Sequence, residues 1–126
     1  MLSQETKEKL ILNLLDLDNK LEQKKESLAN HLIGKCCMFR TYSAGVHFGI
    51  LKAKNDQECL VENAQRVFYW TEACSLSQLA MEGSKNFDGC KIAMPVDEIV
   101  LDQVIEIIPM PESVVKDFRD AKQWKK

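Results

Sequence analysis

Residues 66–83 join a strand-like run to a helix-like run and read RVFYWTEACSLSQLAMEG. The first part places a cation ahead of three consecutive aromatic side chains, which suits a half-buried strand. Because strand side chains alternate, we expect Arg66, Phe68 and Trp70 on one face, and the residues between them on the other. The stretch therefore predicts a strand that carries a cation and stacking rings on one side.

The second part of this stretch predicts a short helix. Ser75 is placed to cap a helix that runs through Met81, and we expect Gly83 to stop it. A stacking ring, a cation and a helix N-terminus would then lie a few residues apart, and a phosphate-bearing nucleotide can use all three. An alternative stays open, in which the aromatic side chains belong to the core and the serine only caps the helix.

The composition indicates one modest domain without the charge of a nucleic-acid binder. The 126 residues suffice for one hydrophobic core, and a formal net charge of -2 does not support affinity for DNA or RNA polymers. The five cysteines, which include adjacent Cys36 and Cys37, do not read as a disulfide framework and indicate a reducing cytosol. No run of spanning length and no signal peptide is evident, so we expect no membrane partner.

A leucine stripe near the N-terminus predicts one helix over residues 3–31. The leucines follow alternating four- and three-residue steps, interrupted by Lys24, at positions Leu10, Leu14, Leu17, Leu21 and Leu28. Such a helix would extend about 40 Å, which is longer than a compact domain of this size can cover. Residues 1–33 are therefore predicted to form an oligomerisation helix, with packing on its own domain as the alternative, and residues 34–126 a sheet-based ligand-binding core.

The rest of the chain reads as short strands separated by turns. The expected strands span residues 35–42, 46–53, 58–62, 65–70, 90–94, 98–101 and 103–108. Ser113 is expected to cap a last helix that reaches Trp124. Together these elements predict an α+β fold with a long N-terminal helix, a small curved or barrel-like antiparallel sheet and short helices.

The residues form no enzyme or metal motif. Cys36 and Cys37 lack metal-site spacing, and neither a phosphate-binding loop nor a nucleophile elbow is present. Cys74, near a helix start, has no obvious partner base for nucleophilic catalysis. We therefore predict no catalytic residue, metal or cofactor, and favour binding over catalysis. A small nucleotide-processing enzyme that uses Cys74 or His47 stays an alternative, as does a structural oligomerisation module without a ligand.

The polar break after the first predicted strand is a second candidate for anion binding. Residues 40–45 read RTYSAG, a cation followed by hydroxyl groups and a glycine, which present donors and exposed backbone N–H groups. His47 is either a core histidine with satisfied hydrogen bonds or a donor to the same ligand. Arg66 either neutralises a phosphate or pairs with a carboxylate such as Glu62.

Four strings in the chain resemble a small phage family. They are residues 40–49 (RTYSAGVHFG), 68–70 (FYW), 75–83 (SLSQLAMEG) and 90–92 (CKI). The family is the first described type of Thoeris anti-defence proteins, sponges that sequester the cyclic ADP-ribose signal made by bacterial TIR enzymes. The resemblance runs from about Met38 to Ile108 and does not include the N-terminal helix.

The resemblance implies a non-enzymatic function in the cytoplasm of a host bacterium. The protein would bind a glycocyclic ADP-ribose isomer tightly and leave it chemically intact. It would do so as a homo-oligomer, from dimer to hexamer, with ligand sites between protomers. Cyclic oligonucleotides are a further implied ligand class, bound at separate sites.

The predicted site residues follow from chemistry on the matching strings. Trp70 or Tyr69 would stack on adenine, and Arg66 and Arg40 would neutralise the diphosphate. Hydroxyl groups and nearby backbone would supply hydrogen bonds, and Arg119 and Trp124, outside the strings, are candidates to complete a neighbour's site. The predicted ligand-binding set is Arg40, Thr41, Ser43, Gly45, His47, Arg66, Tyr69, Trp70, Ser75 and Ser77.

Overall fold

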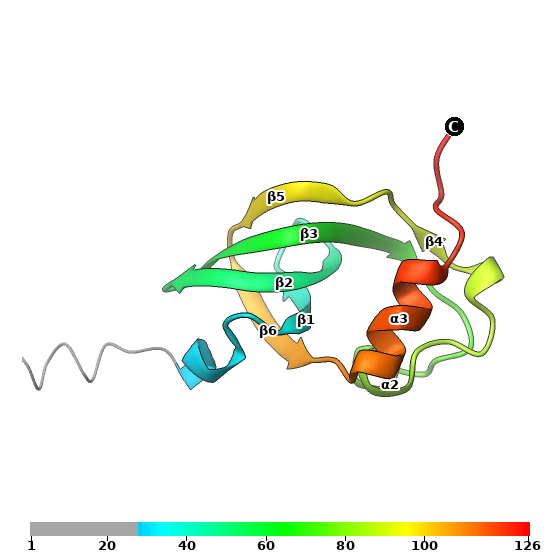
Figure 1. Ribbon diagram of the computed structural model, residues 1–126, viewed down its shortest axis with the longest axis horizontal. Coiled ribbons are helices and arrows are strands. Elements are labelled where there is room, and N and C mark those ends of the chain that lie inside the picture. Colours follow the sequence, from blue (N-terminus) through cyan, green and yellow to red (C-terminus); the bar gives the residue numbers. More distant parts are fainter. Residues whose placement is uncertain (1–27) are drawn as a thin grey trace, which may run out of the picture.

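The computed structural model describes residues 28–126, and strands dominate them. The strands are β1 (Cys36–Thr41), β2 (Val46–Asn55), β3 (Glu58–Tyr69), β4 (Lys91–Ile92), β5 (Val96–Leu101) and β6 (Val104–Pro109). The helices are α2 (Leu76–Glu82), α3 (Glu112–Asp120) and the 3-10 helices η1 (Leu28–Leu32) and η2 (Phe87–Gly89). Figure 1 shows the sheet with α2 and α3 gathered at one end of it.

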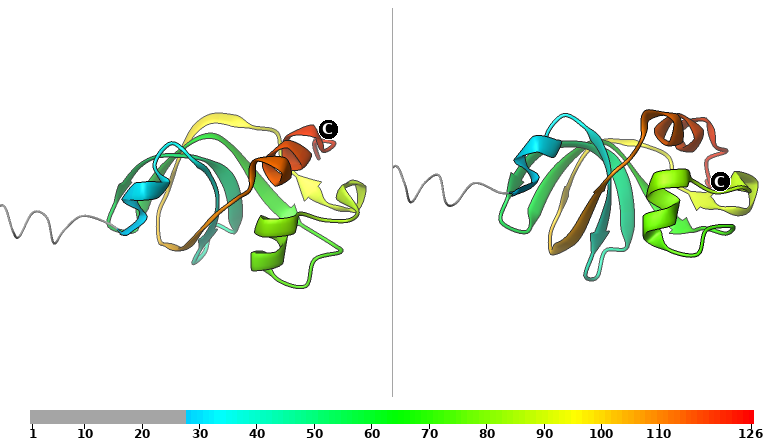
Figure 2. Two further views of the ribbon diagram at one scale, coloured as in Figure 1. Left: turned by 60° about the horizontal axis from the view of Figure 1, so that its bottom comes forward. Right: turned by 90° about the horizontal axis from the view of Figure 1, so that it is seen from below.

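The sheet curls because its two margins are joined by a very short connection. Every pairing between the named strands is antiparallel, and their order is β4-β3-β2-β1-β6, with β5 beside β3. Only Asp102 and Gln103 separate β5 on one margin from β6 on the other. The sheet therefore bends round into an open barrel, as the views in Figure 2 show.

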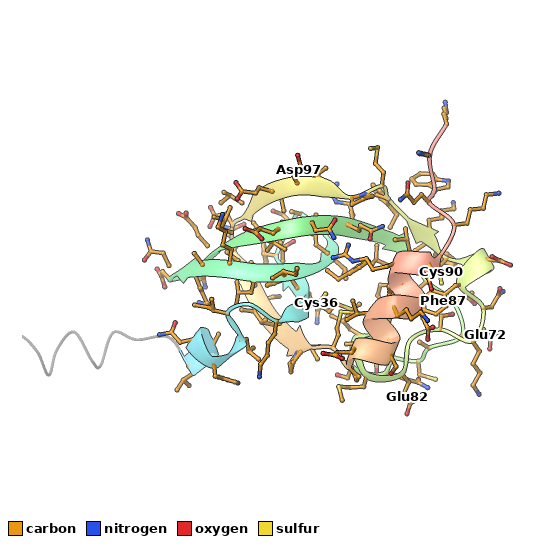
Figure 3. All side chains as sticks on the ribbon, viewed as in Figure 1. Cys36, Glu72, Glu82, Phe87, Cys90 and Asp97 are labelled. Carbon is orange, nitrogen blue, oxygen red and sulfur yellow. The ribbon has the colours of Figure 1, made fainter. Side chains whose placement is uncertain are left out.

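Two apolar clusters fill the two faces of this curled sheet. The inner cluster comprises the buried residues Leu32, Cys37, Phe39, Leu51, Cys59, Val61, Ala64, Leu101 and Val104. The outer cluster lies under α2 and α3 and comprises Met38, Phe48, Val67, Leu79, Ala80, Cys90, Ile92, Met110, Val114 and Phe118. Figure 3 shows Phe87 and Cys90 beside α3, where they contribute to the outer cluster. Successive residues on a strand belong to opposite clusters, because their side chains point to opposite faces of the pleated sheet.

A β-bulge bends β3 near its middle. Opposite Gly49, β3 has one residue more than β2, and Asn63 there adopts a left-handed backbone with φ of 50°. Such a bulge bends its strand and increases the local twist. The first half of β3 pairs with β5 and the second half with β4. The bulge thus separates a half of β3 that closes the barrel from a half that extends beyond it.

The predicted α+β class is wrong. The described residues are mostly sheet, and their two α-helices have only seven and nine residues. No long N-terminal helix is among them, because Leu28–Leu32 form the 3-10 helix η1, and residues 3–27 of the predicted helix lie outside the described range. The periodicity of the leucine stripe suggested a helical layer, whereas the fold is determined by a sheet that buries a cluster on each face.

The helix predicted after Ser75 is confirmed. The Ser75 hydroxyl accepts a hydrogen bond from the Gln78 amide at 3.1 Å, and Gly83 ends α2 with φ of 75°. The cap oxygen satisfies one of the amides that the first turn leaves without a helical partner. The serine cap and the glycine stop in the sequence therefore predicted both ends of α2.

Two other element predictions need correction. The strands expected at residues 58–62 and 65–70 are one strand, β3, because the bulge lies inside it. The last helix begins after Pro111, which makes no side-chain cap bond, so Ser113 is not its N-cap. That helix ends at Asp120, and the residues from Ala121 onward, including Trp124, continue in non-helical conformation.

Candidate functional site

The second half of β3 presents a cation and an aromatic ring on the inner face of the sheet. The Arg66 Cζ atom lies 5.4 Å from the centroid of the Phe68 ring, which is about half exposed. Val67, between them, is buried on the opposite face under the helices. The shared face predicted for Arg66 and Phe68 is therefore confirmed.

A cavity of about 190 Å³ opens beside these two side chains. Strands β2, β3 and β5 and the connection between β4 and β5 supply its walls. The lining residues are His47, Ala64, Arg66, Phe68, Ala93, Met94, Val96 and Ile99. Apolar walls with a few polar groups are the usual composition of a small-molecule site. We refer to this cavity as the Arg66 pocket.

Hydrogen bonds hold the wall between β4 and β5 against β3. The Ala93 amide donates to the Arg66 carbonyl at 2.9 Å, and the buried Gln65 amide group donates to the Ala93 carbonyl at 2.8 Å. The Gln65 side-chain oxygen accepts in turn from the Arg119 guanidinium on α3 at 2.6 Å. Helix α3 therefore supports one wall of the Arg66 pocket from the outer face of the sheet.

His47 closes the floor of the pocket in its neutral form. Its side chain is 2% exposed, and Nε2 lies 2.9 Å from the Ala44 carbonyl and 3.4 Å from Arg66 Nε. Burial lowers the pKa of His47, the Ala44 carbonyl partly opposes that shift, and the Arg66 charge lowers the pKa further. A neutral ring cannot use Nε2 both as donor and as acceptor. The shorter distance assigns its proton to the Ala44 bond, which leaves the Arg66 guanidinium free for a ligand.

The buried neutral histidine predicts a pH-dependent stability. The pKa of His47 is below its ordinary value of 6.5, so the unfolded chain binds the proton first, and stability present above that pH is lost as the pH falls. We expect the free energy of unfolding to fall less between neutral and acidic pH in His47→Gln than in the wild type. One proton sets a maximum difference of about 1.4 kcal/mol per pH unit. Urea denaturation across this pH range measures it.

The matched control for this measurement is His31→Gln. His31 is the other of the two histidines in the chain and is exposed on η1. Identical pH profiles for the wild type and His47→Gln would refute the assignment of His47 as a neutral buried group.

Arg66 differs from its neighbours in having no acidic partner among the described residues. Arg40 is paired with Glu106 across β1 and β6, with Nη1 and Oε1 3.1 Å apart. Glu62, the expected alternative partner of Arg66, lies 2.9 Å from the Lys52 ammonium group instead. The hydrogen bonds that Lys52 donates to Glu62 and Glu98 raise the pKa of Lys52 to about 12. Arg66 therefore keeps a positive charge beside a cavity with no carboxylate in its lining.

The pocket and its rim unite some of the predicted site residues. His47 and Arg66 line the cavity itself. The β1–β2 turn approaches it through the bond between His47 and Ala44, and Thr41 stabilises that turn by donating to the Gly45 carbonyl and accepting from the Ala44 amide, each at 2.8 Å. The turn requires a φ of 82° at Gly45, which glycine adopts without strain. Ser43 is exposed in the same turn.

The other predicted site residues lie away from the pocket lining. Tyr69 is about half exposed at the end of β3, and Trp70 packs against the outer cluster instead of joining Arg66. The alternation fails at Trp70 because the register shifts after Val67 and the strand ends before it. The remaining members of this group are Arg40, in its ion pair, Ser75, in its cap, and Ser77, exposed on α2.

Sequence reasoning missed every lining residue of the pocket except His47 and Arg66, and Phe68 and Met94 are two of those it missed. Phe68 was expected on the face of Arg66 but was not assigned to the site, although the strand alternation already placed the two together. Met94 comes from the connection after β4, and its approach to Arg66 depends on pairing between residues distant in sequence. Only the first of these two had a signal in the sequence.

Metal binding and membrane insertion receive no support from residues 28–126. That part of the chain contains no group of three or more His, Cys, Asp or Glu side chains able to hold a metal ion. Within the same range, no helix has the length and apolar character that crossing a membrane requires.

Comparison with known proteins gives a family and a loose structural likeness. No curated protein matches the sequence. A heptameric archaeal Sm protein is 18% identical over 64% of this chain and 93% of its own, with a TM-score of 0.41. The P. aerophilum SmAP1 heptamer is 18% identical over 64% of this chain and 85% of its own, with a TM-score of 0.41. A likeness this weak carries no argument about function or assembly. Residues 34–118 match the model described as a domain of unknown function (DUF6948), and the chain belongs to this family.

Proposed function

We propose that this protein is a phage anti-defence protein of the Thoeris type, which binds a glycocyclic ADP-ribose signal and sequesters it without cleaving it. It acts in the cytoplasm of the host bacterium as a homo-oligomer. The proposal rests on the four strings that resemble the anti-defence family and on one feature of the fold. That feature is Arg66, a cation without a described carboxylate partner, held over Phe68 at the mouth of a pocket.

The chemistry of the Arg66 pocket suits a phosphate attached to a flat base. A guanidinium forms two parallel charge-assisted hydrogen bonds to phosphate oxygens, and its planar donor fork is already oriented. Phe68 offers a ring face or edge within contact distance of the same cation. The apolar lining excludes water, which strengthens the charge interaction.

The size of the pocket indicates how the ligand would lie. At about 190 Å³ it is smaller than the roughly 300–1,000 Å³ of a site that encloses a drug-sized molecule. The pocket would therefore hold only part of a cyclic ADP-ribose isomer. The phosphate region would be placed at Arg66, and the rest of the ligand would extend over the exposed surface around Phe68.

The affinity that a sponge needs favours a site shared between subunits. Competing with a receptor for a scarce signal requires nanomolar binding, about 12 kcal/mol. One stacked base supplies about 1–3 kcal/mol and each charge-assisted hydrogen bond about 1.5–3 kcal/mol, before the cost of immobilising the ligand. A single copy of the pocket falls short of the required total. Contacts from a second protomer would supply the difference and make assembly a condition of tight binding.

Isothermal titration with glycocyclic ADP-ribose isomers tests the proposal. We expect nanomolar affinity, and we expect the ligand released by heating the protein to be recovered intact. Absence of binding at micromolar protein would refute the proposal, and recovery of a linear or hydrolysed product would favour the enzyme alternative. Cyclic oligonucleotides form a second series in the same titration.

Arg66→Met is expected to weaken binding of the cyclic ADP-ribose isomer about 30-fold, or roughly 2 kcal/mol, through loss of one charge-assisted phosphate contact. Methionine retains much of the aliphatic packing, so the fold should persist. Titration of the variant beside Lys116→Met, which removes an exposed charge from α3, gives the comparison. Arg40→Met separates the two site models, since the sequence-based set includes Arg40 and the pocket lining does not. Equal affinity for the wild type and Arg66→Met would exclude Arg66 as the phosphate ligand.

A further inference from the structure

The segment after α3 returns to the sheet beside the Arg66 pocket. Ala121 leaves the helix in an extended conformation, Gln123 forms a parallel bridge with Ile92, and the Trp124 amide donates to the Ile92 carbonyl at 2.7 Å. Figure 1 shows this C-terminal segment running past β4. Trp124 is therefore positioned by backbone pairing next to the strand that precedes the pocket wall.

This return places Trp124 against the exposed aromatic residue of the pocket. The Trp124 and Phe68 ring centroids are 5.1 Å apart at an interplanar angle of 64°, and Trp124 is 52% exposed. Lys91 Nζ lies 5.3 Å from the Trp124 ring centroid. Arg66, Phe68, Trp124 and Lys91 thus form one continuous row, with a cation at each end and two aromatic rings between them.

We propose that Trp124, Phe68 and Lys91 form a purine-binding subsite that adjoins the Arg66 pocket within the same protomer. This inference rests on the proposed function and adds the position of the base. The purine stacks on Trp124, not on Trp70 or Tyr69 as the sequence suggested. The phosphates then lie between Arg66 and Lys91, and neither cation forms an ion pair with a described carboxylate.

The contacts in this row suit an exchange on ligand binding. Lys91 is exposed and rests on the Trp124 ring through a cation–π contact. At exposed sites such a contact is weaker than the stacking of a base on an aromatic side chain. A purine can therefore take the place of the ammonium group on the ring. The flexible lysine side chain then carries its charge toward the phosphates, where it forms a charge-assisted hydrogen bond.

The two tryptophans of the chain provide a direct optical test. Trp70→Phe leaves Trp124 as the only tryptophan, and Trp124→Phe leaves Trp70. Each protein is titrated with a glycocyclic ADP-ribose isomer, with adenosine monophosphate and with inorganic pyrophosphate, which has no base. We expect the two adenine ligands to quench fluorescence in the Trp70→Phe protein, with little change in the Trp124→Phe protein. We expect pyrophosphate to quench neither.

Affinity measurements on two further variants separate stacking from charge. Trp124→Leu is expected to weaken binding of the cyclic ADP-ribose isomer at least about tenfold, or about 1.4 kcal/mol, and to leave pyrophosphate binding unchanged. Lys91→Gln is expected to weaken the binding of both the isomer and pyrophosphate. The isomer should still quench the fluorescence of Trp124 in this variant. Circular dichroism confirms the fold of each variant, and the Trp124–Ile92 backbone bond does not depend on the indole ring.

The outcomes distinguish this subsite from the function on which it rests. Tight binding of the isomer without quenching of Trp124, and with full affinity in Trp124→Leu, would overturn the subsite and leave the proposed function intact. Quenching by adenosine monophosphate in a protein that does not bind the isomer would support the subsite and refute the proposed function. Absence of both signals would overturn both.

Discussion

Phe118→Ala is expected to lower the free energy of unfolding by about 3–5 kcal/mol. Phe118 on α3 is 0% exposed, and its ring centroid lies 4.9 Å from the centroids of both Phe48 on β2 and Phe87 on η2. The side chain therefore joins the last helix, the sheet and the loop between α2 and β4. Truncation leaves a cavity that these three elements cannot all collapse to fill. A loss of this size is a large share of the stability of an ordinary domain, which is about 5–15 kcal/mol.

Urea denaturation followed by circular dichroism measures this loss. Phe68→Ala is the matched control, because it makes the same truncation on a ring that is about half exposed and outside both apolar clusters. We expect its cost to be well below that of Phe118→Ala. Similar costs for the two variants would contradict the packing of α3 on the sheet.

The parts of the fold that follow local rules were predictable from the sequence. The ends of α2 depend on a hydrogen bond within four residues and on one glycine with positive φ. Alternation of side chains correctly placed Arg66 and Phe68 on one face, since both lie in the regular part of β3. These features need only the chain within a few residues of themselves.

The features that sequence reasoning missed depend on pairing between distant segments. The alternation rule failed at Trp70 because a register shift against β4 ends the regular strand before that residue. The return of Trp124 to Ile92 joins residues 32 positions apart, and the pattern of residues 113–124 suggested a longer helix instead. The predicted N-terminal helix biased the class assignment toward α+β, although the described residues are mostly sheet.

In the candidate site, too, features set by local sequence were predictable and features set by pairing of distant segments were not. Residues 40–49, one of the matching strings, bring a turn and His47 to one edge of the pocket. Arg66, which supplies the cation, lies outside the four strings. The opposite wall comes from the connection between β4 and β5, which carries no chemical motif and is positioned by Gln65 and Arg119 from across the sheet. The predicted set therefore contains the polar residues that line the candidate pocket, His47 and Arg66, and none of its apolar residues.

Gly49 connects the bend of β3 to the pocket, because the close contact of the two strands occurs there. A Cβ atom at this position would lie 2.6 Å from Val61 Cγ1, 2.9 Å from the Glu62 carbonyl oxygen and 3.1 Å from Ala64 Cα. Two of these three atoms belong to the backbone of β3, so a change of side-chain rotamer cannot relieve the overlap. His47 precedes Gly49 by two residues on β2, and Arg66 follows the bulge on β3.

Gly49→Ala is expected to lower the free energy of unfolding by about 3 kcal/mol, at the upper end of the usual cost of overpacking, because the β-bulge must shift to admit the methyl group. The same shift moves the half of β3 that carries Arg66 away from His47, so ligand affinity should fall together with stability. Thermal unfolding and titration of the variant measure the two effects.

Gly45→Ala is the control, since a Cβ there would meet no atom within 4 Å and only the φ of 82° opposes the substitution, at about 1 kcal/mol. Equal stability of the two glycine variants would show that the contact between β2 and β3 at Gly49 does not align the pocket. The orientation of Arg66 would then depend on the hydrogen bonds of Ala93 and Gln65 alone.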